Sequence, residues 1–310
     1  MNCHLFIQKF FGLFFAAGMA LGFFFPDYLI VVSDYSLLIL GCVMTMTFLS
    51  VDLEAALHNL RRIHVTGIVF ILTKAVIPFL LFHLTRPLGE HISIAVLLLS
   101  LTPFAAISPT LTRIVGGDAE FILVQQILQT LISPFYMPFL FLLIAGSSIS
   151  IDVFQMVKIL VFLILIPFAI SLVIRFTLHG LIIKTKKFFP AASILFIALL
   201  LSGLLATAAE PVKADPLKAL PLAALSFALA AVLMFSGWFV FFFLDRKKRL
   251  GIAVGHLYMN IGLTAVLAAG FFGPEVLLFV LIYELPANLL PPLMGKIGLF
   301  RERPDGDRSI

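Results

Sequence analysis

The sequence contains little charge. Asp, Glu, Lys and Arg make up 12% of its 310 residues, whereas a soluble domain carries about 25%. Hydrophobic residues make up 62%, with 34 Phe among them, and the mean hydropathy is +1.15. This composition excludes a water-soluble globular protein and a nucleic-acid-binding protein, even though the pI is about 9.3. It predicts an integral protein of the lipid bilayer.

Cysteine is almost absent as well. Cys3 and Cys42 cannot form a disulfide framework, and Cys42, inside an apolar run, is predicted to be a small packing residue. The chain also contains no HExxH, GxSxG or P-loop motif, which typify metalloproteases, serine hydrolases and nucleotide hydrolases. We therefore expect that the protein is not an enzyme and has neither a metal site nor a cofactor. Na⁺ and H⁺ are the candidate coupling ions.

Long apolar runs, in contrast, are abundant. A helix that crosses the hydrocarbon core of a bilayer needs about 20 mostly apolar residues, and ten such stretches can be read. We therefore predict an all-α membrane protein with a single domain over residues 1–300, and a polar, disordered tail over residues 301–310. The predicted spans are residues 6–25, 35–51, 63–85, 91–114, 119–146, 153–177, 188–209, 218–244, 250–271 and 275–298.

The placement of the basic residues tests this count. With both termini in the cytoplasm, sixteen of the 21 Lys and Arg residues fall in inside segments. Three (Arg86, Lys213 and Lys218) fall in outside segments, and two (Lys74 and Lys158) lie within spans. Because basic residues concentrate on the cytoplasmic side, this bias favours ten spans, cytoplasmic termini and a location in the cell (inner) membrane.

The ten spans divide into two sets of five. Because five is odd, a duplicated half must insert upside down relative to the first, as in the inverted repeats of many secondary transporters. We expect one repeat over about residues 6–146 and the other over about residues 153–298. A short match between residues 111–112 and 263–264, Leu-Thr in both, adds support.

Two of the predicted helices are interrupted at comparable depth. The fourth contains Pro103 and Pro109, each of which removes a backbone donor in mid-membrane. The ninth contains the flexible and polar run from Gly255 to Gly262. Such paired breaks indicate a midplane binding site, whose half-helix N-termini suit an anion. The alternative to a binding site is that the prolines only kink the helix and the glycines only serve helix packing.

These stretches resemble the bile acid:sodium symporter family, and the resemblance covers most of the chain. Residues 103–146 are similar to helices 4 and 5 of that family, and residues 260–288 to helices 9 and 10. The matching motifs are Ser-Pro at 108–109, Gly-Asp at 117–118, Ser-Pro at 133–134, Asn-Ile-Gly-Leu at 260–263, Phe-Gly-Pro at 272–274, and Asn288.

The resemblance implies a panel domain of helices 1, 2, 6 and 7 and a core domain of helices 3–5 and 8–10. Helices 4 and 9 would cross at their breaks. It also implies transport of organic anions by alternating access, usually driven by sodium.

The sodium sites that the resemblance implies are altered here. Ser108 is retained, but the asparagine after it is Pro109, and the glutamate of helix 9 is Gly255. Neither replacement supplies a side-chain oxygen, so we predict that the usual sodium sites are lost. The remaining altered positions are Thr73, Ile122, Gln126 and Met259.

Lys74 and Glu284 are the ionisable residues predicted deepest in the membrane. Placing a charge at the centre of a spanning helix costs about 2.5–3.5 kcal/mol, so such residues are rare. Our hypothesis is that Lys74 supplies the positive charge that sodium supplies elsewhere, and that Glu284 balances it or carries a proton. A buried ion pair, or a Lys74 that reaches the membrane surface, is the alternative.

We therefore predict a carrier of a small or amphipathic organic anion; a passive channel and a ligand sensor with a transporter fold are the alternatives. The sequence does not fix the oligomeric state.

For the side-chain amides of helix 5, interhelical hydrogen bonding is the alternative to a role in ion coupling. For His256, a packing role is the alternative to substrate binding. The predicted substrate-binding residues are Ser108, Pro109, Thr110, Thr112, His256, Asn260 and Asn288. The predicted ion-coupling or sodium-replacing residues are Lys74, Glu284, Gln126, Gln129 and Met259.

Overall fold

The computed structural model describes residues 3–51, 63–146, 151–214, 217 and 219–290. Within these residues every named element is a helix, and there is no β-strand. The predicted tail over residues 301–310 and the end of the predicted span 275–298 lie outside the described residues.

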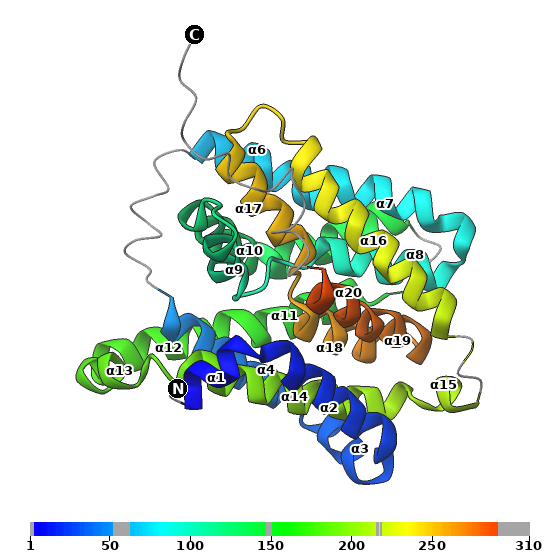
Figure 1. Cartoon of the computed structure of the whole chain (residues 1–310), viewed down its shortest axis with the longest axis horizontal. Coiled ribbons are helices and arrows are strands. Elements are labelled where there is room, and N and C mark those ends of the chain that lie inside the picture. Colours follow the sequence, from blue (N-terminus) through cyan, green and yellow to red (C-terminus); the bar gives the residue numbers. More distant parts are fainter. Residues whose placement is uncertain (1–2, 52–62, 147–150, 215–216, 218, 291–310) are drawn as a thin grey trace.

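The helices form two groups (Figure 1). In the first, which we call the panel group, α14 packs along α2, α3 and α4, and α12 packs on α4. Its elements are α1 (Cys3–Lys9), α2 (Phe11–Phe24), α3 (Pro26–Asp34), α4 (Ser36–Ser50), α11 (Val153–Leu160), the π-helical turn η4 (Val161–Leu165), α12 (Ile166–Thr177), α13 (His179–Thr185) and α14 (Phe189–Ala208).

The second group, which we call the core group, contains the two broken helices. Here α7 packs on α8, α16 on α17, and α17 on α9 and α10, while α18 and α19 face α14 of the panel group (Figure 1). The short α15 (Glu210–Ala214) follows α14. The core elements are α6 (Ile63–Ile71), the π-helical turn η2 (Leu72–Val76), α7 (Ile77–Thr85), the 3₁₀ turn η3 (Arg86–Leu88), α8 (Glu90–Leu101), α9 (Ser108–Ile114), α10 (Ala119–Ala145), α16 (Ala219–Phe239), α17 (Arg246–Leu257), α18 (Ile261–Phe271), α19 (Pro274–Ile282) and α20 (Glu284–Leu289).

Five helical stretches are long and apolar enough to cross a membrane: His64–Leu88, Ala119–Ala145, Val153–Thr177, Phe189–Ala208 and Ala219–Phe239. Two bent pairs, α1 with α2 and α3 with α4, raise the number to seven if each pair is one span. These helices are those of a multi-pass membrane protein. The count of ten and the inverted repeat stay predictions.

The structure corrects several sequence expectations. The predicted span 6–25 is bent by 78° between α1 and α2, and α3 precedes the predicted span 35–51 at an angle of 67°. The predicted span 275–298 breaks at Tyr283, shortly before Pro286, which cannot donate a helical hydrogen bond. Cys42 is exposed on α4, so its prediction as a packing residue is wrong.

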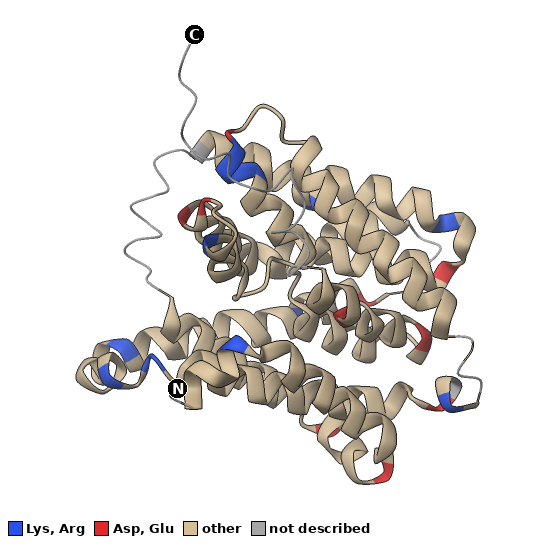
Figure 2. Cartoon of the chain, viewed as in Figure 1, with Lys and Arg blue, Asp and Glu red and all other residues tan. Residues whose placement is uncertain are grey.

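The basic residues lie mainly at one end of the molecule. Figure 2 shows them gathered at the end that contains α13, the start of α17 and the N-terminus. At the other end, around α3 and α15, acidic residues accompany the few basic ones. This separation along the helix axes is the one that the positive-inside pattern requires.

Candidate functional site

The two broken helices meet at their breaks. One break lies between α8 and α9 and the other between α17 and α18. Phe104 and Met259 form an isolated antiparallel β-bridge at the crossing. Each break thereby satisfies part of the other's backbone, which lipid cannot do. The flanking hydrogen bonds run from the Ala105 N–H to the Tyr258 carbonyl (2.8 Å) and from the Asn260 N–H to the Pro103 carbonyl (2.9 Å).

Pro103 accounts for the end of α8. It has no N–H to continue the helical ladder, and the N–H of Phe104 donates to Oε1 of Gln129 on α10 at 3.1 Å. The Ser100 carbonyl therefore loses its helical donor. The Thr102 carbonyl, at the end of the same helix, also has no backbone donor among the described residues. A buried carbonyl without a donor is costly, so both oxygens need partners.

Lys74 supplies the missing donors. Its Nζ donates to the Thr102 carbonyl at 2.5 Å and to the Ser100 carbonyl at 3.2 Å. Nζ also lies 3.8 Å from Sδ of Met259 and 5.0 Å from the centre of the Phe104 ring. The side chain is 0% exposed. Among the described residues, the partners of this buried charge are carbonyls, a thioether and an aromatic face, and none is a carboxylate.

Lys74 sits in a local widening of its helix, the π-helical turn η2. Pro78 has no N–H to donate to the Lys74 carbonyl four residues earlier. The N–H of Ile77 instead donates to the Leu72 carbonyl, five residues earlier. Turns of this kind are frequent at functional sites. The Ile77-Pro78 pair thus explains why the helix widens at the residue that carries the charge.

Hydroxyl groups tie the second break to the first. Oγ1 of Thr264 lies 2.8 Å from Oγ1 of Thr102 and donates to the Asn260 carbonyl at 2.9 Å. The side-chain oxygen of Asn260 accepts from the N–H of Leu263 at 3.1 Å, so Asn260 caps the start of α18. In this conformation the Asn260 side chain acts as a helix cap.

Phe104 fills the space beside Gly255. A Cβ placed on Gly255 would lie 2.6 Å from Cε2 of the Phe104 ring. The same ring covers Lys74 and meets the His256 ring edge-on at 5.7 Å between centroids. The volume next to Gly255, where the resemblance places a glutamate, is therefore occupied by an aromatic side chain.

Glu284 is separate from Lys74. It begins α20, is 6% exposed, and accepts a hydrogen bond from Nδ2 of Asn288 at 2.7 Å on its Oε2 atom. Glu284 forms no ion pair with any residue that the structure describes. Lys74 and Glu284 therefore do not form the buried ion pair that was the alternative to a role in ion coupling.

Two cavities lie between the panel and core groups. The inner cavity, of about 570 Å³, lies between α1–α2 and α9, α17 and α20, and its wall includes Lys9, Tyr258, Glu284 and Asn288. The outer cavity, of about 430 Å³, is lined by the start of α4, by α14 and by the α18–α19 connection. Between them α18 packs against α4 and α14. The chain thus has a cavity on either side of a closed contact between the groups.

The predicted substrate residues lie in several environments. Asn288 lines the inner cavity, whereas Oγ of Ser108 donates to the Tyr258 carbonyl at 3.1 Å. Thr112 is fully buried, while Thr110 is exposed and Pro109 half-buried. His256 faces α16, with Nδ1 at 3.1 Å from both Oγ of Ser236 and the Leu233 carbonyl. Their roles in binding stay predictions.

The two glutamines predicted on α10 differ in their contacts. Gln129 belongs to the crossing because its side chain accepts from Phe104. Gln126 donates to Oγ1 of Thr130 on its own helix at 3.3 Å, and its Oε1 is buried without a partner among the described residues. Met259 lies directly beside Lys74. The structure therefore brings Gln129, Met259 and Lys74 together at the crossing.

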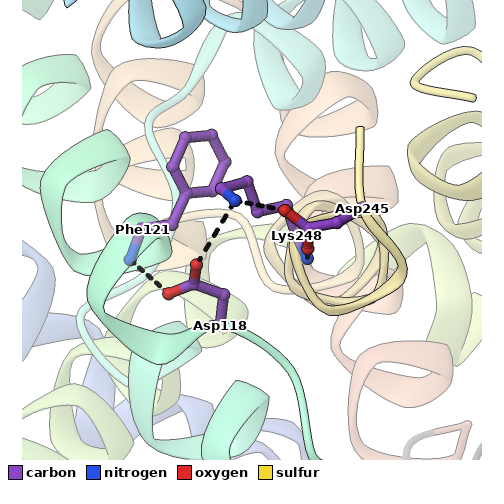
Figure 3. A network of polar contacts seen from close by, with 4 residues as sticks. All are labelled: Asp118, Phe121, Asp245 and Lys248. Carbon is purple, nitrogen blue, oxygen red and sulfur yellow. Dashed lines mark hydrogen bonds and ion pairs between the residues drawn. The ribbon is translucent and has the colours of Figure 1, made fainter. Parts of the chain in front are cut away.

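A polar network joins the two halves of the core group at the end that holds the start of α17 (Figure 3). Asp118 caps α10 by accepting from the Phe121 N–H at 2.9 Å, and Asp245 caps α17 by accepting from the Lys248 N–H at 3.0 Å. The Lys248 ammonium pairs with Asp245 and lies 3.9 Å from Asp118. Burial alone would raise the pKa of Asp245, but the hydrogen bonds and charge of Lys248 outweigh it and lower that pKa.

Sequence reasoning missed two aromatic residues of the site. Phe104 covers the Lys74 ammonium, and the Tyr136 hydroxyl donates to the Leu101 carbonyl at 2.8 Å, satisfying another group at the end of α8. The sequence could have indicated Tyr136, because it lies inside an apolar helix between Pro134 and Pro138 and a buried tyrosine hydroxyl needs a hydrogen-bond partner.

The sequence model of the Sodium Bile acid symporter family matches residues 37–215, more than half of the chain. The protein belongs to this family. Members of the sodium bile acid symporter family are transporters, and the apolar helices described above agree with a transport protein of the membrane. The matched residues include Lys74, α8, α9 and α10, and so the first half of the crossing. No curated protein matches the chain.

Proposed function

We propose that the protein is a secondary active transporter of organic anions that works by alternating access, and that Lys74 takes the place of a bound sodium ion. The position of one ammonium group carries the proposal. Nζ of Lys74 lies at the crossing of the broken helices, on the carbonyls of Ser100 and Thr102. Carbonyl oxygens at broken helices are also ligands for alkali cations.

The residues around the ammonium group support this replacement. Met259 presents a sulfur atom to Nζ at 3.8 Å, where the resemblance places a glutamine, and hard cations favour oxygen over thioether ligands. Gly255 supplies no carboxylate, and the Phe104 ring fills the adjacent space. An ammonium group with three N–H donors satisfies this set of partners, whereas a sodium ion would lack oxygens there.

The charge at the crossing favours an anionic substrate. The Lys74 charge has no carboxylate partner among the described residues, so it makes the crossing positive. Glu284 faces the inner cavity from a different helix. The two cavities on either side of a closed contact support movement of the core group against the panel group. Coupling would then be to protons, or the exchange would be independent of ions.

The test is uptake into proteoliposomes of a panel of radiolabelled carboxylates, with a sodium gradient and a pH gradient imposed separately. We expect saturable flux and counterflow that a sodium gradient does not stimulate. Strictly sodium-driven uptake would overturn the proposed role of Lys74. Flux without saturation or counterflow would indicate a channel, and tight binding without flux would indicate a sensor.

A further inference from the structure

The inner cavity combines a buried acid with an aromatic wall. Glu284 is 6% exposed and lies in the cavity wall together with Phe11 and Tyr258, whose ring centroids are 6.3 Å apart. Asn288 donates to Oε2 of Glu284 but brings no positive charge. Within the described residues the carboxylate has no cationic partner. The Asn288 amide already supplies a hydrogen-bond donor, so what the occupant of the cavity could add is a positive charge that balances the carboxylate.

The shape and the lining of the cavity define the rest of the ligand. The volume of about 570 Å³ is walled mostly by apolar side chains of α2, α9 and α20, which suits a hydrocarbon body. Aromatic faces beside a carboxylate are the surroundings in which proteins bind ammonium groups. These features favour an amphipathic molecule that presents a cationic group to Glu284.

Lys9 supplies the opposite charge in the same cavity. It is the last residue of α1, is exposed, and lines the cavity with its ammonium 5.5 Å from the centre of the Phe10 ring. α1 belongs to the panel group, whereas Glu284 belongs to the core group. The cavity therefore offers a cation from one group and an anion from the other, a pattern complementary to a ligand that carries both charges.

We propose that the inner cavity binds an amphipathic zwitterion, with its ammonium group at Glu284 and its carboxylate toward Lys9. This inference rests on the proposed function in one respect: it assumes that the inner cavity is part of the route along which the substrate is transported. It narrows the substrate class from organic anions in general to organic acids that also carry an amine.

The test is equilibrium binding to the purified full-length protein in detergent, with three probes of equal chain length: ω-aminooctanoate, octanoate and octylamine. Because a hydrogen-bonded charge contributes about 1.5–3 kcal/mol, we expect ω-aminooctanoate to bind about tenfold more tightly than octanoate. Glu284→Gln should remove this preference. The matched control is Glu275→Gln, the same change at an exposed acid of α19, which should leave the preference intact.

A second variant guards against a folding defect in Glu284→Gln. Lys9 is exposed, and Lys9→Met should weaken ω-aminooctanoate and octanoate alike while leaving octylamine unchanged. Equal affinity of wild type for ω-aminooctanoate and octanoate would overturn the inference, as would tighter binding of octylamine than of ω-aminooctanoate. Tight binding of ω-aminooctanoate without flux in proteoliposomes would uphold this inference and contradict transport, so the two failures are distinguishable.

Discussion

Nζ of Lys74 lies 3.8 Å from Sδ of Met259, a residue 185 positions further along the chain. This contact joins the helix that carries the charge to the second broken helix, and the same ammonium group binds two carbonyls of the first. One side chain therefore connects three segments at the centre of the core group, as a bound cation would. The predictions below follow from this arrangement and from the contacts around it.

Replacing Lys74 should be far more damaging than replacing the other lysine within a predicted span. Lys74→Met keeps the bulk but leaves the carbonyls of Ser100 and Thr102 without donors, which costs about 1–3 kcal/mol each. Lys158 is exposed on α11, so Lys158→Met should change stability by no more than about 0.5 kcal/mol. Thermal unfolding in detergent and uptake in proteoliposomes measure the difference. Similar behaviour of the two variants would contradict the assigned role of Lys74.

The Gly255 position should not accept a side chain. Gly255→Ala places a Cβ within 2.6 Å of the Phe104 ring, and such overpacking costs about 1–3 kcal/mol. Because the displaced ring also covers Lys74, transport should fall together with Tm. Adding Phe104→Leu makes room, so the double variant should recover part of the Tm lost in Gly255→Ala. A Gly255→Ala protein with wild-type Tm would show that the ring is not confined.

The hydroxyl pair at the crossing should contribute to stability through hydrogen bonding. Thr264→Val keeps the shape of the side chain but removes its bonds to Thr102 and to the Asn260 carbonyl. We expect a loss of about 1 kcal/mol, measured as a lower Tm. Thr264→Ser retains the hydroxyl and is the control. If Thr264→Ser, which keeps the hydroxyl, lowered Tm as much as Thr264→Val, the loss could not be assigned to the hydrogen bonds of the hydroxyl.

The network of Asp118, Asp245 and Lys248 should make stability depend on pH in the acid range (Figure 3). The pKa of Asp245 in the folded protein is lower than its ordinary value of 3.8. Its charge therefore stabilises the fold fully above that value, and the contribution is lost as pH falls through the lower, folded pKa. Asp245→Asn retains the helix cap and isolates the charge.

We expect Asp245→Asn to lower Tm slightly at neutral pH, because partly exposed ion pairs contribute about 0.2–1 kcal/mol. The Tm difference from wild type should shrink as the pH falls below the ordinary pKa of the carboxyl. A difference that stays constant into strong acid would show that the effect is not ionic.

Part of this site follows from the sequence. Pro103 predicts the end of α8 because proline has no N–H to donate, and the rarity of a lysine in an apolar span marks Lys74. The polar run before Gly262 likewise indicates the second break. These signals are local, and each depends on residues within a few positions of one another.

The contacts around Lys74 and Glu284 do not follow from the sequence. Whether the two residues pair depends on the rotation of α20, which is set by the break at Tyr283, and one sequence contains no information on that angle. The Phe104 ring covers Lys74 only because the breaks pair in one register, with Phe104 opposite Met259. Long-range register of this kind is decided by packing between segments and not by either segment alone.

The most direct test of the central claim is the binding of radioactive sodium to the purified protein, which requires no knowledge of the substrate. If the Lys74 ammonium occupies the cation position, wild type should show no saturable sodium binding at neutral pH. Lys74→Ala, which frees the carbonyls of Ser100 and Thr102, should be measured beside it, and sodium binding that appears only in this variant would show that the ammonium group occupies a cation position. Saturable sodium binding by wild type would contradict the account.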